Sequence, residues 1–315
     1  MDFQKLLTDN IKTFTEDGYY VWCGSMFEQS GKYYLAYSRW KRELGFSAWV
    51  TDSEICLAAA DSPMGDFRHI KTLRRKRNSG WDASCAHNPT VITAGGKFYL
   101  FYMGNHGNGD WWTHRNNQRI GMAWAYDPEG VWHFADRPAI DVSESGFDSL
   151  MVSNPTVTET PNGKLLMVYK GVSKSETLPK GDDVVCGVAV AESPGGEFRK
   201  IGRPIMVNPE NGWSVEDPFI WRGDDRFYAL VKDFQGYFTG TDGSATALFE
   251  SDDGIDWKPS ECPLAFERKL AGKPVYKLER PQIFFENGRP SILICACAAD
   301  EKFDAVFSVR IKLKQ

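Results

Sequence analysis

The chain has 315 residues, of which 42% are hydrophobic and 14% aromatic, so it is long enough and apolar enough to bury a substantial core. Its formal net charge of −5 argues against nucleic-acid binding, which requires a clustered basic face. No stretch of the sequence approaches the roughly 20 apolar residues of a membrane span. The first residues also lack the pattern of a signal peptide. We therefore expect no membrane contact and a cytoplasmic location, or a periplasmic or secreted one if a signal peptide has been removed.

The seven cysteines are an odd number, and no two of them form a CxxC pair. Most lie in apolar, strand-like segments, where a thiol packs as a small core side chain. We therefore expect neither disulfide bonds nor structural zinc, which favours a reducing compartment. The sequence also has no dedicated Ca²⁺ loop, so we expect no required metal and no cofactor.

One short pattern recurs five times after an N-terminal extension at residues 1–17, in steps of 63 to 66 residues. The copies are Gly24-Ser25-Met26-Phe27, Asn88-Pro89-Thr90-Val91, Asn154-Pro155-Thr156-Val157, Asp217-Pro218-Phe219-Ile220 and Arg280-Pro281-Gln282-Ile283. A turn and then an aromatic or aliphatic strand follow each copy. A fixed long period built from short strands is typical of radial repetition.

The repeat predicts an all-β fold, a five-bladed β-propeller with blades of mostly four antiparallel strands around a central funnel. Because the five units use almost the whole chain, we expect a single domain over residues 1–315. Residues 1–17 would pack outside the ring or help to close it.

The start of each innermost strand lines the funnel of a propeller, so the residue pairs at these starts are expected to share one pocket. These pairs are Cys23-Gly24, His87-Asn88, Ser153-Asn154, Glu216-Asp217 and Glu279-Arg280. Unpaired buried charges cost several kcal/mol each, so such a cluster favours a ligand site. The alternative is a set of structural pairs that satisfy each other, for example Glu279 with Arg280.

A second pattern precedes two of these strands. Trp81-Asp82 and Phe147-Asp148 each place an aspartate six residues before the inner-strand asparagine. These carboxylates could cap the loop by accepting hydrogen bonds from its backbone, or they could stand at the mouth of the pocket. The sequence leaves both interpretations open.

The five inner strands, their Pro-x-Val starts and the Ser-Pro-x-Gly-x-aromatic turns resemble the five-bladed propeller glycoside hydrolases of the family 43 and family 32 group. Val215-Glu216-Asp217-Pro218 matches the fourth-blade Glu-x-Pro segment that carries the general acid in those enzymes. The resemblance therefore implies that Glu216 protonates the departing glycosidic oxygen. The chain departs from the family at Gly24 and Asn154, where those enzymes have aspartates.

Glycoside hydrolysis normally needs two carboxylates, so a second group is expected from elsewhere in the funnel. We favour Glu279 or Asp217, because both lie at inner-strand starts. His87 could serve as acid or base, since imidazole titrates in the useful range, or it could be a core histidine. Further candidates for the second carboxylate are Asp82, Asp148 and Asp233.

Other polar and aromatic residues near strand ends are expected to bind the substrate. Besides Asn88 and Asn154, these are Trp22, Arg39, Trp40, His106, Lys170, Lys232 and Arg280. Their basic members favour a sugar that carries carboxylate or sulfate, unless they pair with the nearby acids. The loop from Asn105 to Arg115 is expected to form a pocket rim with a stacking tryptophan.

We therefore expect a glycoside hydrolase that acts on a terminal, and on this pattern anionic, sugar of an oligo- or polysaccharide. Exo-action is favoured because a funnel closed at one end accepts a chain end. Two alternatives remain: a non-catalytic carbohydrate-binding propeller, and a non-hydrolytic carbohydrate enzyme such as a phosphorylase or lyase. The sequence does not specify the sugar, the linkage, the stereochemical outcome or the oligomeric state.

Overall fold

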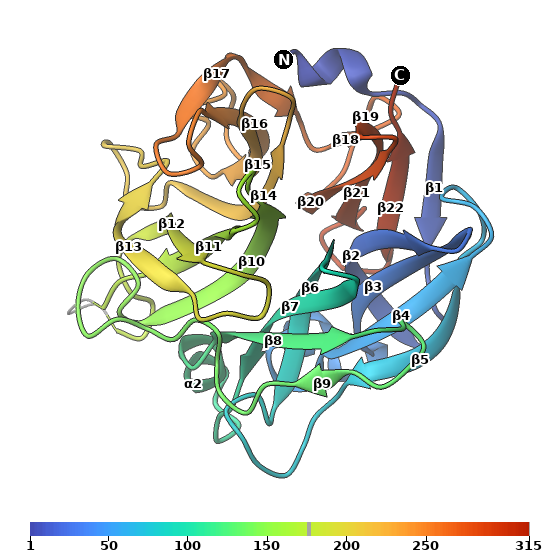
Figure 1. Cartoon of the computed structure of the whole chain (residues 1–315), viewed down its shortest axis with the longest axis vertical. Helices are drawn as coiled ribbons and strands as arrows, with labels where there is room; N and C mark the ends of the chain where they lie inside the picture. The colour runs from blue at the N-terminus through green and yellow to red at the C-terminus, as the bar shows by residue number, and fades with distance from the viewer. Residues whose placement is uncertain (175–177, 315) are drawn as a thin grey trace.

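Five four-stranded antiparallel sheets surround a central axis in the computed structural model, which describes residues 1–174 and 178–314 (Figure 1). The predicted all-β, five-bladed propeller is confirmed. The blades follow one another in chain order around the ring, and within each of the first four the strands run from the axis outwards.

The first two blades are built from residues 19–134. The first comprises β2 (Tyr19–Gln29), β3 (Lys32–Lys41), β4 (Glu54–Ala60) and β5 (Arg68–Arg74). The second comprises β6 (Cys85–Ala94), β7 (Lys97–Asn105), β8 (Arg119–Ala125) and β9 (His133–Phe134).

The third and fourth blades repeat this order. The third comprises β10 (Met151–Glu159), β11 (Leu165–Val172), β12 (Val184–Ala191) and β13 (Arg199–Ile205). The fourth comprises β14 (Val215–Arg222), β15 (Phe227–Asp233), β16 (Ala245–Ser251) and β17 (Lys258–Phe266).

The fifth blade joins the two ends of the chain. Its strands are β20 (Lys277–Glu286), β21 (Arg289–Ala298), β22 (Val306–Lys312) and, at the outer edge, β1 (Ile11–Phe14). In the antiparallel pairing of β1 with β22, Ile11 lies opposite Ile311. Part of the N-terminal extension therefore closes the ring by completing its last sheet.

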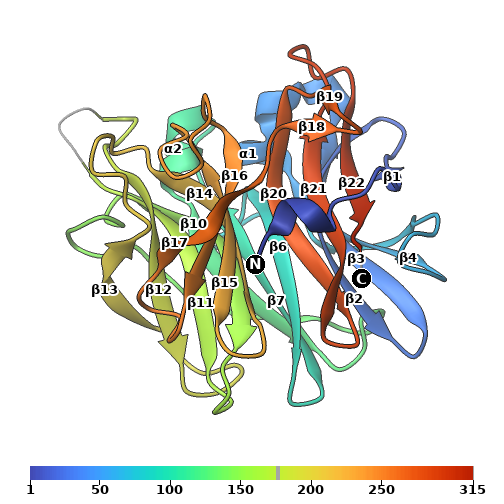
Figure 2. The ribbon, with the colours of Figure 1, turned by 90° about the horizontal axis from the view of Figure 1, so that it is seen from above.

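Short elements gather at one end of the ring. Figure 2 shows α1 (Trp49–Asp52), α2 (Trp111–Asn116) and the small β18–β19 hairpin (Lys269–Leu270 and Lys273–Pro274) on the same face of the propeller. The remaining short helices are 3-10 turns at Phe3–Leu6, Arg42–Leu44 and Phe46–Ala48. Among the described residues, no helix combines the length and apolarity that a membrane crossing needs.

Aromatic and aliphatic side chains fill the spaces between neighbouring blades. Phe27 of the first blade contacts Phe98 of the second, with ring centroids 5.3 Å apart. Phe101 of the second blade meets Phe198 of the third at 5.7 Å. Full burial of such a side chain contributes about 1.5–3 kcal/mol, so much of the aromatic content stabilises the ring.

Each inner strand contains the same bulge, where its pairing with the next strand shifts register. One residue at each bulge has a left-handed backbone, which is uncommon outside glycine. These residues, with φ between 50° and 57°, are Cys23, Asn88, Asn154, Asp217 and Arg280. The fivefold repeat is therefore a conformational repeat that points one side chain per blade towards the axis.

The position of the bulge changes how the first blade aligns with the other four. The residue equivalent to Asn88 is Cys23, not Gly24, because only Cys23 shares the left-handed backbone. Gly24 instead takes the place of the prolines, and a Cβ there would lie 2.7 Å from Leu35 Cδ1. Trp22 consequently occupies the position that Glu216 occupies in the fourth blade.

Candidate functional site

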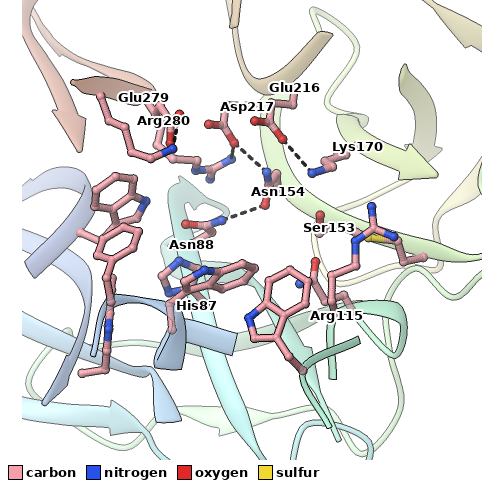
Figure 3. Close-up of a pocket in the computed structure, with 18 of the residues that line it drawn as sticks. His87, Asn88, Arg115, Ser153, Asn154, Lys170, Glu216, Asp217, Glu279 and Arg280 are labelled. Carbon is pink, nitrogen blue, oxygen red and sulfur yellow. Dashed lines mark hydrogen bonds and ion pairs between the residues drawn. The ribbon is translucent and has the colours of Figure 1, made fainter. Parts of the chain in front are cut away.

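A cavity of about 270 Å³ opens on the axis, and inner strands from all five blades line it (Figure 3). It lies on the face that carries α1 and α2, whose tryptophans contribute to its wall. Below it, Gln282 Nε2 crosses to the Pro89 carbonyl (3.0 Å) and to Thr90 Oγ1 (3.1 Å). These contacts between blades separate it from a second hollow, of about 700 Å³, at the other end of the inner strands.

Four of the five bulge residues form a polar row at the floor of the pocket. Asn88 Nδ2 donates to Asn154 Oδ1 (2.7 Å), and Asn154 Nδ2 donates to Asp217 Oδ1 (2.6 Å). Arg280 NH1 lies 3.6 Å from the same aspartate oxygen. Within the described chain, Asn88 Oδ1 and the Nε and NH1 groups of Arg280 are buried without a hydrogen-bond partner. The floor therefore keeps one acceptor and two donor groups available for a ligand.

The wall formed by the fourth and fifth blades alternates carboxylates with lysines. Glu216 accepts hydrogen bonds from Lys170 Nζ (2.7 Å) and Lys232 Nζ (3.0 Å), one on each oxygen. Lys232 also donates to Glu279 Oε1 (2.7 Å), and so does Lys277 (3.1 Å). Glu279 Oε2 receives no hydrogen bond from any described residue, so this oxygen remains available. Glu279 thus pairs with lysines and not with Arg280, the partner that the structural alternative suggested.

These lysines decide the ionisation of Glu216. Burial opposes the charged form, but Lys170 and Lys232 outweigh it and hold the pKa of Glu216 well below its usual range. In Glu279, Lys232 and Lys277 likewise outweigh burial and lower the pKa. A proton donor must be protonated before reaction, so this environment does not suit the role that the family resemblance implies for Glu216.

Asp217 has the opposite environment. Burial, followed by the negative charge of Glu216, raises the pKa of Asp217 to about 6. The residue is only 4% exposed, and its charged neighbour Arg280 offsets these effects only in part. Adjacent carboxyl groups with separated pKa values are typical of an acid and its ionised partner.

His87 is held as a neutral imidazole. Its ring lies between Trp40 and Trp49, with centroid distances of 5.6 and 5.2 Å, and its Nδ1 lies 2.8 Å from Ser53 Oγ. Burial, followed by Arg280, lowers the pKa of His87 to about 3. The expectation that His87 titrates near neutral pH therefore does not hold, although the residue lines the pocket.

Aromatic side chains cover the side of the pocket nearest the first two blades. Trp22 and Trp40 were expected there from the sequence; the others are Phe46, Trp49, Trp111, Trp112 and, from the third blade, Trp213. Trp111 and Trp112 lie in the loop predicted as the rim. The segment with Phe46 and Trp49 was missed, but it occupies the same place in its blade, between the second and third strands. An aromatic insertion at that place is the signal that could have identified it.

Lys170 and Lys232 reach the site because of strand register. Lys170 lies opposite Ser153, and Lys232 lies opposite Glu216, so both share a face with the inner-strand residues. Lys170 lines the cavity, whereas Lys232 lies behind the carboxylates that it joins. Arg39 and Asp233 are one residue beyond the equivalent register and point to the other face.

Besides Lys232, five residues predicted for the site lie outside the pocket lining, and each has partners elsewhere in the protein. The first three are Arg39, Asp233 and His106. Arg39 pairs with Glu16 and Glu54, and Asp233 accepts backbone hydrogen bonds from residues 236, 238 and 239. His106 is exposed, with Nδ1 3.2 Å from the Trp81 carbonyl oxygen.

The other two are the aspartates of the aromatic-Asp pairs, which serve the blades and not the pocket. Asp82 accepts a hydrogen bond from the Tyr102 hydroxyl (2.8 Å), and Asp148 accepts one from the Tyr169 hydroxyl (2.9 Å). Basic side chains complete both sites: Arg74 and Arg77 for Asp82, and Lys200 for Asp148. The two aspartates therefore hold the loops before β6 and β10 against the second strands of their blades.

Three basic residues of the lining were not named as binding residues from the sequence, although the first of them ends the loop predicted as the rim: Arg115, Lys180 and Lys277. With Lys170 and Arg280 they make five basic side chains against three carboxylates among the described residues of the lining. Lys277 could have been found from its place at the start of an inner strand. Arg115 and Lys180 come from connecting segments, where spacing carries no signal.

The family model of the glycosyl hydrolases family 32 N-terminal domain matches residues 86–310, which is more than two thirds of the chain. A curated relative, the beta-1,2-mannobiose phosphorylase of Thermoanaerobacter sp. (strain X514), is 30% identical over 115 residues. That match covers 34% of this chain and 35% of the relative, so it spans about a third of either protein.

Solved structures share the fold at low sequence identity. A glycoside hydrolase superposes with a TM-score of 0.73 at 14% identity, covering 99% of this chain and 91% of that one. Zg3597, a family 117 glycoside hydrolase of Zobellia galactanivorans, gives 0.70 at 16% identity, with 99% and 92% covered. The Bacillus subtilis arabinanase Arb43A gives 0.63 at 14% identity, with 96% of each chain covered. These likenesses establish the five-bladed architecture, and the family model establishes that the chain belongs to the glycosyl hydrolases of family 32, matching their N-terminal domain.

Proposed function

We propose that the protein hydrolyses the glycosidic bond of a terminal sugar unit, with Asp217 as the proton donor. The observation that carries this proposal is the buried carboxyl of Asp217, whose pKa is raised to about 6 beside an ionised Glu216. A general acid works best when its pKa lies near the working pH. The usual aspartate pKa of about 3.9 would leave too little of the protonated form.

The second carboxylate of the reaction is assigned to Glu279. Its Oε1 binds both Lys232 and Lys277, while Oε2 has no hydrogen bond from the described residues and remains available to the pocket. Both oxygens of Glu216, in contrast, are bound by lysines. Glu216 is therefore a positioning residue that raises the pKa of Asp217, and Glu279 is the ionised group that faces the sugar.

The reaction then follows the two-carboxylate scheme of glycoside hydrolysis. Asp217 gives its proton to the departing oxygen, and the Glu279 carboxylate stabilises the positive charge that develops on the sugar ring. The bond between the anomeric carbon and that oxygen breaks. Water then adds its hydroxyl to the anomeric carbon, and its other proton passes to the Asp217 carboxylate, which restores the acid. Exo-action is supported by the shape of the site, because Gln282 and Thr90 close the axis below the cavity.

The test uses a panel of aryl glycosides and oligosaccharides to find a substrate, followed by the variants Asp217→Asn and Glu279→Gln. Both variants should lose turnover but keep sugar binding. Azide should restore cleavage in Glu279→Ala, because a small anion can replace a missing carboxylate, and it should not restore Asp217→Asn. Full activity in either amide variant would contradict the assignment of that residue.

Phosphorolysis is a second candidate, favoured by the excess of basic residues around the cavity. Among the described residues, the three carboxyl groups of the lining lie on the fourth and fifth blades, so the described part of the opposite wall offers no carboxylate to activate water. A phosphate ion needs no such base, and the beta-1,2-mannobiose phosphorylase relative supports this chemistry. Turnover that requires inorganic phosphate and yields a sugar 1-phosphate would replace hydrolysis by phosphorolysis. Free sugar formed equally well without phosphate would exclude it.

A further inference from the structure

Arg115 differs from three other basic side chains of the pocket. Lys170 and Lys277 each contact a glutamate, and Arg280 lies near Asp217. Arg115 is only 8% exposed, yet it has no ion-pair partner among the described residues. Its NH1 group donates hydrogen bonds to Asn116 Oδ1 (2.9 Å) and to the carbonyl oxygen of Lys180 (2.8 Å).

These two bonds fix the guanidinium without neutralising it. Burial lowers the pKa of Arg115 to about 10, with Glu216 offsetting part of the effect, so the group stays charged at neutral pH. A buried charge without a counter-ion is costly, and a ligand anion removes that cost. Because NH1 is occupied, the edge formed by Nε and NH2 is available, and this edge matches the two oxygens of a carboxylate.

Ser153 provides a second, independent sign of a ligand. Its hydroxyl lines the same cavity, is 1% exposed and has no hydrogen-bond partner among the described residues. Figure 3 draws Arg115 on the side of the pocket where Ser153 and Lys170 lie, away from Glu279. A free guanidinium edge and an unsatisfied hydroxyl thus face the cavity from the second and third blades.

The surroundings favour a sugar acid over a free ion. The Trp112 ring lies 5.8 Å from the guanidinium carbon of Arg115, and Lys180 Nζ lies 4.4 Å from the centre of the Trp213 ring. Both tryptophans line the cavity, so an anion at Arg115 would be bordered by aromatic faces. Aromatic rings supply contact area to the apolar faces of a sugar ring, which a small inorganic anion does not use.

We propose that Arg115 and Ser153 form a subsite that binds the carboxylate of a uronic acid, so that the terminal sugar taken by the pocket is a sugar acid. This proposal rests on the proposed function only for the claim that a sugar enters the cavity. Arg115 binds the carboxylate through its Nε and NH2 groups, Ser153 Oγ donates to it, and Lys180 at the rim adds a second positive charge.

The test measures binding, so it does not depend on turnover. Isothermal titration calorimetry of the full chain would compare glucuronic acid with glucose, galacturonic acid with galactose, and mannuronic acid with mannose, with inorganic phosphate as a further ligand. At least one acid should bind about tenfold more tightly than its neutral partner, as expected for a charge-assisted hydrogen bond. Arg115→Gln should remove that preference and leave the neutral sugar unchanged, and Ser153→Ala should reduce it about threefold.

Two further variants serve as controls. Arg115→Lys keeps the charge and the aliphatic stem but loses the two-pronged edge, so it should fold and still lose most of the preference. Arg137→Gln changes an exposed arginine outside the pocket and should match the unaltered protein. Thermal unfolding of each variant separates lost binding from lost folding.

Three results would overturn the subsite: equal affinity for every acid and its neutral partner, a preference that survives in both Arg115 variants, or dependence on Arg115 for phosphate alone. Failure of the proposed function has a different signature, which is an Asp217→Asn variant that retains full turnover. Uronic acid binding that depends on Arg115 in a protein without turnover would support the subsite and contradict the hydrolase.

Discussion

The pocket has two unlike walls built from one repeated strand position. In the fourth and fifth blades this position holds Glu216 and Glu279, each bound to two lysines. In the first three blades it holds Trp22, His87 and Ser153. The inner-strand backbone is the same in all five blades, with a bulge and one left-handed residue, so at this strand position the walls differ only in side chains.

This difference separates two tasks. The charged wall, formed by the fourth and fifth blades, lowers the pKa of Glu216 and raises that of Asp217, which suits proton transfer. The aromatic wall holds His87 neutral and offers ring faces and a few polar groups, which suits binding. Changes to the first wall should therefore alter turnover and stability, whereas changes to the second should alter affinity.

The largest effect is expected from Asp217→Asn. This change removes the proposed proton donor but keeps the shape and the contact with Asn154. General acid catalysis contributes about 10²–10⁴-fold, so kcat should fall within that range while the binding of product is kept. Steady-state kinetics give the result, and Asp225→Asn, on the exposed surface, should leave kcat unchanged.

Lys232→Met should cause the next largest effect, on stability. Lys232 joins Glu216 to Glu279, and its removal leaves two buried carboxylates facing each other with one lysine each. Breaking a buried ion pair costs about 3–5 kcal/mol, whereas loss of the exposed, solvent-screened Lys41–Glu43 pair should change the stability far less. Chemical denaturation of Lys232→Met and Lys41→Met measures both. Equal losses would show that the charged wall is not a buried network.

Glu216→Gln should move the pH profile. The active form of Asp217 is protonated, so activity should fall as pH rises through its pKa of about 6. Removing the negative charge of Glu216 leaves Arg280 and Lys232 acting on Asp217 with only Glu279 as a counter-charge, so the pKa of Asp217 should fall. The alkaline limb of kcat/KM should then move to lower pH. A limb that stays in place or moves upward would contradict the proposed coupling.

Trp49→Ala should have the smallest effect and should act on binding alone. Trp49 stands beside His87 on the aromatic wall and makes no contact with the carboxylates. We expect KM to rise about tenfold, which corresponds to about 1.4 kcal/mol, with kcat unchanged. Trp124→Ala, a half-buried residue of β8 outside the pocket, is the matched control. A fall in kcat equal to that of Asp217→Asn would remove the distinction between the two walls.

The fold could be predicted from the sequence because a similar pattern of residues recurs at the start of the inner strand in each of the five blades. The one misalignment arose in the first blade, where Gly24 replaces proline and the bulge residue Cys23 had to be identified from its backbone. The same recurring strand starts explain why these residues, predicted from the sequence, all line the pocket: Glu216, Asp217, Glu279, Arg280, His87, Asn88 and Asn154.

The rest of the site depends on features that do not follow the period of the sequence repeat. Arg39 and Asp233 fall on the wrong face because a shift of one residue reverses the direction of a side chain in a strand. Arg115 and Lys180 come from connecting segments, which follow no period. The roles of Glu216 and Asp217 could not be separated either, because their pKa values depend on lysines from two different blades.

The most direct test of the account is the titration of Asp217 itself. Carbon-13 NMR of the aspartate carboxyl groups, assigned by comparison with Asp217→Asn, follows this one proton through the pH range. The account predicts a midpoint near pH 6 for the Asp217 signal. A midpoint below pH 4, as in an ordinary exposed aspartate, would contradict the claim that the charged wall prepares Asp217 as the proton donor.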